Sequence, residues 1–417
     1  MKKLVGILTV IILILGVIFG YKIVYKASPR DFITKDTRVI YSNENINKKD
    51  FTPILALLDD EKSKEKFNSN LKDLKYISKF YIFSDKEFYE LSDKSFTGVI
   101  DTGYWYFLLL KDIEKYFEQG NDNIYVMKKE AREKYLPQLK SDIFMKNYRG
   151  LFIISLGEKN LKDFIEKDGK YLYNKEIEES LDSKKDELFG TLVYNNSGTD
   201  FYGITTITNS ATIKDNKIIS NGEIYIDENE NDTFKSTKEK RELVKYINKN
   251  DIYVSIDDFS KLDKYIFNSF FLGANVDSKA IFAVWKNFLG IDAEEILKEI
   301  DGELILKVGN PSFMVKIKED SHEIKRILTL LKDPDSVFYT DDDIREENGI
   351  LTIGNFELKE NANPYTINDG VFIFGKLNSK DIMGFEGMET SIEGRDQKIV
   401  IESEITIDLF KELMREY

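Results

Sequence analysis

The sequence predicts an α+β fold, in which one N-terminal transmembrane helix precedes two related lobes, each an antiparallel sheet with helices packed on one face. Three observations lead to this prediction: an uncharged apolar segment near the N-terminus, strand-like alternation of apolar and polar residues, and a block of sequence that occurs twice. We assign residues 1–26 to the anchor, 27–235 to the first lobe and 236–417 to the second.

Residues 4–21 read LVGILTVIILILGVIFGY and carry no charge. At about 1.5 Å per residue such a helix spans roughly 27 Å, about one hydrocarbon core. A cleaved signal peptide is the alternative, but cleavage after Ala27 would put the bulky Tyr25 where a small residue is needed. Lys2 and Lys3 favour a cytoplasmic N-terminus, although basic residues also follow the segment. We therefore expect a single-pass signal-anchor protein of the cell membrane, with most of the chain extracytoplasmic.

The composition excludes several function classes. The chain has 417 residues, a net charge of −14, no Cys and one His. An acidic surface repels phosphate backbones, so we expect no nucleic-acid partner. Without Cys, disulfides, iron–sulfur clusters, thiolate zinc sites and Cys nucleophiles are impossible. We expect no cofactor and no transition-metal site.

The strongest internal similarity lies between residues 215–227 (DNKIISNGEIYID) and 396–408 (DQKIVIESEITID), where seven of 13 positions are identical without a gap. Both blocks alternate with period 2, which predicts a half-buried antiparallel strand in each. We expect each strand to leave a tight turn, and Ile224 and Ile405 to be buried at equivalent positions. Further blocks recur in the same order, which predicts two copies of one lobe.

The remaining elements follow from local signals. Asn348-Gly349 predicts a hairpin turn, and Asp292 with Glu295 predicts the capped start of a helix. Ser236-Thr-Lys-Glu239 has the pattern of a capping box that opens a helix between the lobes. Helices are expected at residues 111–119, 128–140, 236–249, 260–271, 278–289 and 292–300.

Four patterns imitate catalytic or metal sites, and each has a simpler structural interpretation. His322 stands in a charged helix start, and Ser63 and Lys66 have acyl-transfer spacing without the accompanying motifs. Gly370–Leu377 imitates a phosphate-binding loop but has Leu where Ser or Thr must hold magnesium. Asp227–Asp232 begins like a calcium loop but lacks its glycine and its final glutamate. We therefore assign no catalytic, cofactor-binding or metal-binding residue.

Two further groups have a weak case for binding. Asp341–Asp343 with Glu346 and Glu347 could hold calcium weakly, and solvated turns are the simpler interpretation. Tyr104-Trp-Tyr-Phe107 could stack on sugar rings, but we expect half of it in the core and half on a sheet surface.

The anchor, Ile252–Phe259 before a helix, Leu289-Gly-Ile-Asp292 with its helix, and Gly370–Phe374 opening a late unit occur in one order. This layout resembles the internally duplicated, membrane-anchored bacterial envelope proteins classed as domains of unknown function. The resemblance covers most of residues 37–417 and implies no activity and no functional residues.

These observations favour a single-pass envelope protein whose duplicated extracytoplasmic region binds or scaffolds a partner. Its partners would be the membrane, through residues 4–21, and an envelope protein or ligand that the sequence does not identify. Two alternatives stay open: a carrier that holds a lipid or other apolar ligand in a cleft between lobes, and a hydrolase that acts on glycans with carboxylates alone.

Overall fold

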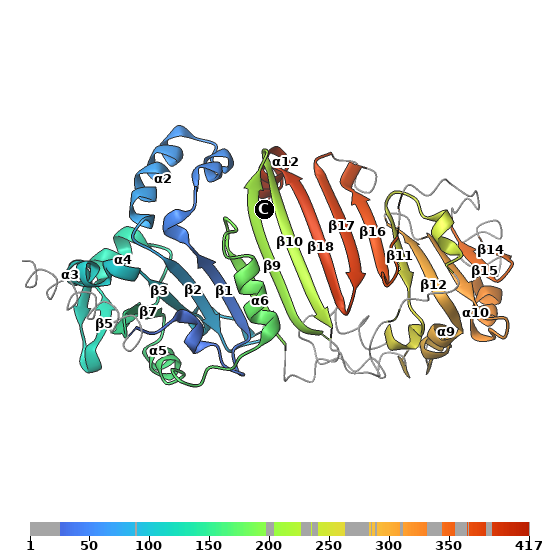
Figure 1. Cartoon of the computed structure of the whole chain (residues 1–417), viewed down its shortest axis with the longest axis horizontal. Helices are drawn as coiled ribbons and strands as arrows, with labels where there is room; N and C mark the ends of the chain where they lie inside the picture. The colour runs from blue at the N-terminus through green and yellow to red at the C-terminus, as the bar shows by residue number, and fades with distance from the viewer. Residues whose placement is uncertain are drawn as a thin grey trace, which may run out of the picture. The chain divides into compact units, whose positions relative to one another are not determined.

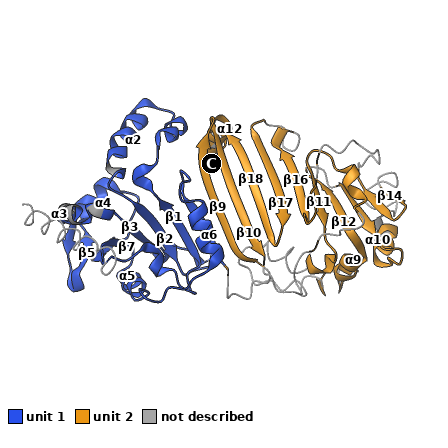
Figure 2. Cartoon of the chain, viewed as in Figure 1, with its two compact units in different colours: residues 1–195 blue, residues 196–417 orange. Residues whose placement is uncertain are grey.

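The computed structural model describes residues 26–416 except 88–89, 197–203, 227–234, 236–240, 263–282, 285, 288–289, 309–311, 332–343, 355–364, 366 and 381–385. The chain divides into two compact units, residues 1–195 and 196–417 (Figure 2). The sequence had placed the lobe boundary after residue 235. The structure assigns residues 204–226 to the second unit because they form a hairpin that pairs with a strand near the C-terminus.

The predicted α+β class is wrong. The described residues form eighteen strands in antiparallel pairs, with few and mostly short helices. Where residues 236–249 were expected to form a helix, the described part shows only a 3-10 turn at Leu243–Tyr246, followed by a strand at Asp251. Consecutive segments turn back as hairpins, so backbone groups are satisfied between strands rather than within helices. No described helix is long and apolar enough to cross a membrane, and the predicted anchor at 4–21 lies outside the described residues.

Unit 1 has strands in the order β8-β1-β2-β3-β7-β6-β5-β4, with every neighbouring pair antiparallel (Figure 1). The strands are β1 (Val39–Glu44), β2 (Lys79–Ser84), β3 (Thr97–Asp101), β4 (Phe117–Gln119), β5 (Ile124–Met127), β6 (Phe144–Tyr148), β7 (Leu151–Ser155) and β8 (Thr191–Asn195). The helices are α2 (Glu61–Leu74), α3 (Tyr106–Tyr116), α4 (Lys129–Tyr135), α5 (Glu158–Ile165) and α6 (Lys175–Ser183).

Two predicted helices of unit 1 differ from the observed ones at their ends. Residues 111–119 were expected to be helical, but α3 ends at Tyr116 and β4 takes the next three residues. Residues 128–140 contain only the two turns of α4. The core of the unit contains Phe32, Tyr81, Phe83 and Phe164, so the segment that follows Lys26 is already part of the fold.

Unit 2 has strands in the order β9-β10-β18-β17-β16-β11-β12-β13-β15-β14, again all antiparallel (Figure 1). The strands are β9 (Ile204–Lys214), β10 (Lys217–Ile226), β11 (Asp251–Ser255), β12 (Ile300–Lys307), β13 (Ser312–Ile317), β14 (Ile344–Glu347), β15 (Ile350–Ile353), β16 (Ile373–Asn378), β17 (Met388–Arg395) and β18 (Lys398–Thr406). The helices are α9 (Ala293–Glu299), α10 (Glu323–Leu331) and α12 (Ile407–Glu416).

Several local predictions are confirmed in unit 2. Asn348 and Gly349, with φ of 52° and 75°, form the hairpin turn between β14 and β15. Asp292 caps α9 by accepting a hydrogen bond from the backbone N–H of Glu295. The helices expected at 260–271 and 278–289 lie almost wholly outside the described residues.

Most of the two similar blocks, 215–227 and 396–408, forms β10 and β18, which confirms the strand prediction for residues 217–226 and 398–406. Ile407 and Asp408 instead begin α12, and Asp227 lies outside the described residues. Each strand follows a two-residue turn with positive φ at both positions, Asp215-Asn216 and Asp396-Gln397, as hairpins of this type require. The two strands also pair with each other along their whole length, from Lys217 opposite Thr406 to Tyr225 opposite Lys398.

The register of this pairing is symmetric with respect to the two blocks. Lys217 and Lys398 occupy the same position in their blocks, and each lies opposite the partner strand's far end. Ile218 faces Ile405 and Ile224 faces Ile399, so two equivalent isoleucine pairs lie on one face. Ile224 and Ile405 are both half-buried, and neither belongs to a described core cluster. The expectation that both would be buried is therefore wrong.

Because they are half-buried in equivalent surroundings, Ile224→Asp and Ile405→Asp should each lower the free energy of unfolding by about 1–2 kcal/mol. The two losses should agree within about 0.5 kcal/mol, and Lys217→Ala, which removes an exposed ion pair with Glu404, should change little. Urea denaturation of the purified variants measures all three. A difference above about 1 kcal/mol between the two isoleucine variants would contradict their equivalence.

Candidate functional site

A groove of about 580 Å³ lies on one face of unit 2, across β16, β17 and β18. The cross-strand register explains its lining, because residues that face each other on neighbouring strands point to the same side of the sheet. Phe374 lies opposite Glu393, and Lys376 lies opposite Ser391. The lining residues are Phe374, Lys376, Ser391, Ile392, Glu393, Arg395, Asp396, Lys398, Val400 and Glu402.

The groove carries three basic and three acidic side chains. Several are held in place by neighbours: Lys398 Nζ lies 2.8 Å from Glu223 Oε1 and 5.0 Å from the ring centre of Tyr225. Lys376 Nζ lies 5.5 Å from the ring centre of Tyr365. Burial alone would lower the pKa of Lys398, but the hydrogen bond and charge of Glu223 raise it above its usual value.

Arg395 is the least satisfied charged group of the groove. Its Nη2 forms an ion pair with Glu393 Oε1 at 3.3 Å. Nevertheless, its Nε and Nη2 are both buried and have no hydrogen-bond partner among the described residues. A guanidinium offers five donors in a planar fork that matches carboxylates, so unpaired donors here are a place where a ligand acceptor fits.

A second hollow of about 240 Å³ adjoins the groove and shares Lys376, Ser391 and Glu402 with it. Here Glu389 and Glu404 face each other on neighbouring strands. Facing carboxylates repel, but Lys217 Nζ lies 2.6 Å from Glu404 Oε2. The amide of Asn378 donates to Glu389 Oε1 at 3.2 Å. Both carboxylates are therefore satisfied by fixed donors.

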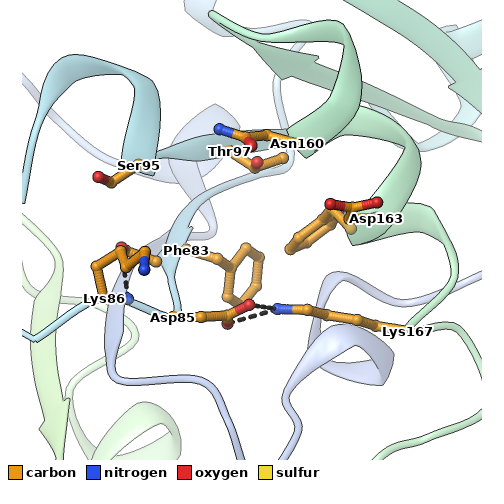
Figure 3. Close-up of a pocket in the computed structure, with 10 residues that line it drawn as sticks. Phe83, Asp85, Lys86, Ser95, Thr97, Asn160, Asp163 and Lys167 are labelled. Atoms are coloured by element: carbon orange, nitrogen blue, oxygen red, sulfur yellow. Dashed lines mark hydrogen bonds and ion pairs between the residues drawn. The ribbon is translucent and has the colours of Figure 1, made fainter.

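Unit 1 has a smaller polar pocket of about 210 Å³ beside β2 and α5 (Figure 3). The rings of Phe83 and Phe164 form part of its wall, with centres 5.3 Å apart. Lys167 donates to both carboxylate oxygens of Asp85, which closes one side of the pocket (Figure 3). Its strongest charges therefore satisfy each other, in contrast to Arg395 in unit 2.

The most strongly perturbed titratable groups of unit 1 surround Glu44, which is buried and accepts hydrogen bonds from Tyr81 and Arg30. Arg30 also binds Glu178 at 2.7 Å, and Lys79 lies 3.0 Å from Glu44. Burial would raise the pKa of Glu44, but Tyr81 and the two cations hold it below its usual value. Burial, with the charge of Glu44, raises the pKa of Tyr81 well above its usual value. This closed and fully partnered cluster is structural.

Unit 2 contains a comparable buried pair. Tyr253 donates to Glu303 Oε1 at 2.8 Å, and Glu303 also accepts from the backbone N–H groups of Glu242 and Leu243 at 2.7 and 3.1 Å. Burial raises the pKa of Glu303 despite these donors. The pair fixes the 3-10 turn at Leu243–Tyr246 to the sheet, which is again a structural role.

The sequence patterns that imitate catalytic or metal sites lie on separate elements of the fold. His322 is exposed at the start of α10, where its backbone N–H donates to Glu299. Ser63 and Lys66 lie on α2, and Ser63 donates its backbone N–H to Asp60. Residues 370–377 lead into strand β16 rather than forming a phosphate-binding loop.

The acidic patterns lie partly outside the described residues. Asp227–Asp232 and Asp341–Asp343 are outside them, while Glu346 and Glu347 are exposed on β14. Among the described residues, no group of three or more His, Cys, Asp or Glu is placed to hold a metal ion.

The aromatic run at 104–107 is helical rather than part of a sheet. It begins in a 3-10 turn and continues into α3. Trp105 is 43% exposed and meets Tyr76 edge-on, whereas Tyr106 is buried against Phe152. The expected division into a core half and a surface half therefore holds for these two residues, but on a helix.

Sequence reasoning missed the groove. The alternation of residues 398–408 was recognised, yet only its apolar face was used. The polar face holds Lys398, Val400 and Glu402, which line the groove with residues of β16 and β17. The charged alternation in β17 was the available signal, but which strands lie beside each other could not be inferred from it.

Replacing Arg30 with Met should lower the free energy of unfolding by about 3 kcal/mol, because the buried Glu44 would lose one of its two cations and a hydrogen-bond donor. Arg30 and Glu44 side chains are only 16% and 7% exposed. The control is Lys64→Met, which removes an exposed pair with Glu61 and should change the free energy of unfolding little. Equal losses in the two urea titrations would show that the Glu44 cluster contributes nothing beyond surface pairing.

Lys49 should make stability rise with pH. Burial lowers its pKa from 10.5 to about 8, so between these values the unfolded chain holds a proton that the folded chain lacks. From pH 8 to 10.5 the wild type should therefore gain roughly 1–2 kcal/mol relative to Lys49→Met, allowing for partial solvent access. Urea denaturation at several pH values measures this difference, and a flat difference would contradict the shift.

Comparisons with known proteins add little. No protein-family model matches the chain, and no curated protein matches it. The chain has a low similarity to solved structures titled crystal forms IV, III and I of TP0453, with identities of 9%, 10% and 10% and TM-scores of 0.31, 0.31 and 0.29. Each match covers 48% of this chain and 81%, 80% and 79% of the other. These TM-scores are too low to argue for a common fold.

Proposed function

We propose that the chain is a binding module whose ligand site is the groove across β16, β17 and β18. The observation that carries the proposal is Arg395, which lines a groove of about 580 Å³ with side chains of both charges and whose Nε and Nη2 have no hydrogen-bond partner among the described residues. The ligand is an extended polar segment of a partner protein, with a carboxylate for Arg395 and basic groups for Glu393 and Glu402.

The strands give the groove a fixed shape. β17 pairs with β16 on one side and β18 on the other, so its side chains project from backbone that is hydrogen-bonded on both edges. Side chains on such strands keep their spacing, and less ordering is needed on binding than in a loop. Because the charges are partly solvated, they contribute mainly to specificity and association rate.

We also propose that the module consists of two copies of one ancestral lobe. Two sets of strands support it: β8-β1-β2-β3-β7-β6 in unit 1 and β16-β11-β12-β13-β15-β14 in unit 2 follow the same order. The symmetric β10–β18 register supports it independently, because each pair has an equivalent pair at the other end of the ladder, as two strands related by a two-fold axis would have.

The module is also proposed to be held at the cell membrane by residues 4–21, with its bulk extracytoplasmic. The 18-residue uncharged segment supports this placement. The partner is then an envelope protein, because the groove must be reached from the same side of the membrane.

The carboxylate-only hydrolase is a weaker alternative. Glu389 and Glu404 are close enough in register for such chemistry, but each is already bound by a neutralising or hydrogen-bonding donor. A glycosidase needs both carboxylates free to reach the substrate, whereas here each is already engaged by a neighbouring side chain.

A photo-crosslinking residue placed at Val400 tests the proposal in the full chain in its own membrane. Val400 lines the groove and carries no charge, so the electrostatics remain intact. Illumination should give one protein adduct of discrete mass, and its yield should fall about tenfold when Arg395→Glu is added or when the salt concentration is raised to 1 M.

Asn68, which is exposed on α2, is the matched control position. The same adduct there, or an adduct at Val400 that Arg395→Glu leaves unchanged, would mean that the groove is not the binding surface.

A further inference from the structure

A separate apolar pocket of about 170 Å³ lies in unit 2, among α9, α10 and the strands β12, β13 and β15. Its lining contains only aliphatic and aromatic side chains. These are Ile296, Ile300, Leu304, Phe313, Val315, Ile324, Ile327, Leu328, Leu351 and Ile353.

The strands form one wall of this pocket through residues that face each other across the ladders. Val315 lies opposite both Leu304 and Leu351, and Phe313 lies opposite Ile353. The opposite wall comes from α10, where Ile324, Ile327 and Leu328 share one helical face. The pocket therefore lies between the apolar face of three strands and the apolar face of a helix.

Polar contacts at the rim hold the two helices in place without filling the pocket. Glu299, at the end of α9, accepts hydrogen bonds from the backbone N–H groups of His322, Glu323 and Ile324 at 2.7, 2.8 and 2.7 Å. Glu323 in turn accepts from the backbone of Asp292 at 2.9 Å. The hydrogen bond with Arg326 lowers the pKa of Glu323 to about 2, so this clamp stays charged at neutral pH.

The pocket is open on one side. Ile296, Phe313 and Ile327 are half-buried, whereas Ile324 and Leu328 are buried. Protein interiors are close-packed, and voids larger than a water molecule are few. Water gains little here because the lining offers it no hydrogen-bond partner, and an apolar cavity of roughly 150 Å³ is large enough for benzene.

We infer that this pocket binds a small apolar group, either a free molecule of about benzene's size or the end of an alkyl chain. The hydrogen bonds between the ends of α9 and α10 fix the two helices relative to each other, the volume limits the size of the ligand, and the lining determines its chemistry. The site is independent of the polar groove, so its failure would leave the proposed binding function untouched.

The absence of Cys from the chain gives a direct test in the full protein, because Ile327→Cys places its only thiol at the mouth of the pocket. The rate of thiol alkylation is measured with benzene and, separately, with hexanoate. Either ligand should slow the reaction at least fivefold at saturation. Protection by benzene alone assigns the pocket to free apolar molecules, and protection by hexanoate assigns it to chain ends.

Ile165→Cys is the matched control, since Ile165 is also half-buried on a helix but lies in unit 1. Its alkylation rate should not change with either ligand. Adding Leu304→Phe to Ile327→Cys fills the pocket and should abolish the protection. Unchanged alkylation of Ile327→Cys with both ligands, or equal slowing of Ile165→Cys, overturns the inference whether or not the filled variant folds.

Discussion

The antiparallel ladder between β10 and β18 is the constraint on which the rest of unit 2 depends. It joins a hairpin from the middle of the sequence to one from its end, so the polar faces of β16, β17 and β18 continue onto β10. Because strand side chains alternate with period 2, a slip of one residue would move Glu223 away from Lys398 and turn the isoleucines to the opposite face. The β10–β18 register thus fixes the neighbours of Lys398 at the edge of the groove.

The ladder also explains why the compact units and the repeated sequence divide the chain differently. β10 belongs by sequence to the first block, but besides its hairpin partner β9 it pairs with β18, which comes from the second block. Two like strands that pair antiparallel satisfy each other's edges, which would otherwise be open to other chains. Here both strands come from the same chain, so no second molecule is needed to cover these two edges.

The sequence correctly predicted turns and a helix cap, which depend on residues close together in the chain. Left-handed residues at Asp396-Gln397 and Asn348-Gly349 mark turns whatever surrounds them, and Asp292 caps a helix through a contact three residues away. The class of the fold was mispredicted because the pairing of strands far apart in the chain is a long-range property, which no local signal encodes. The groove was missed for the same reason: Lys376, Arg395 and Glu402 meet only once the strand order is known.

The first described residues limit how far the protein can extend from its proposed anchor. Lys26 forms an ion pair with Asp101 at 2.6 Å, and Ala27 is buried and hydrogen-bonded to Arg149. Only residues 22–25 separate Lys26 from the end of the apolar segment, and even a fully extended chain over that stretch covers at most about 18 Å. With residues 4–21 in a bilayer, unit 1 would be joined to the membrane by a very short segment. It would remain beside the lipid surface, among headgroups and other short-tethered proteins, and could not sample the more distant envelope.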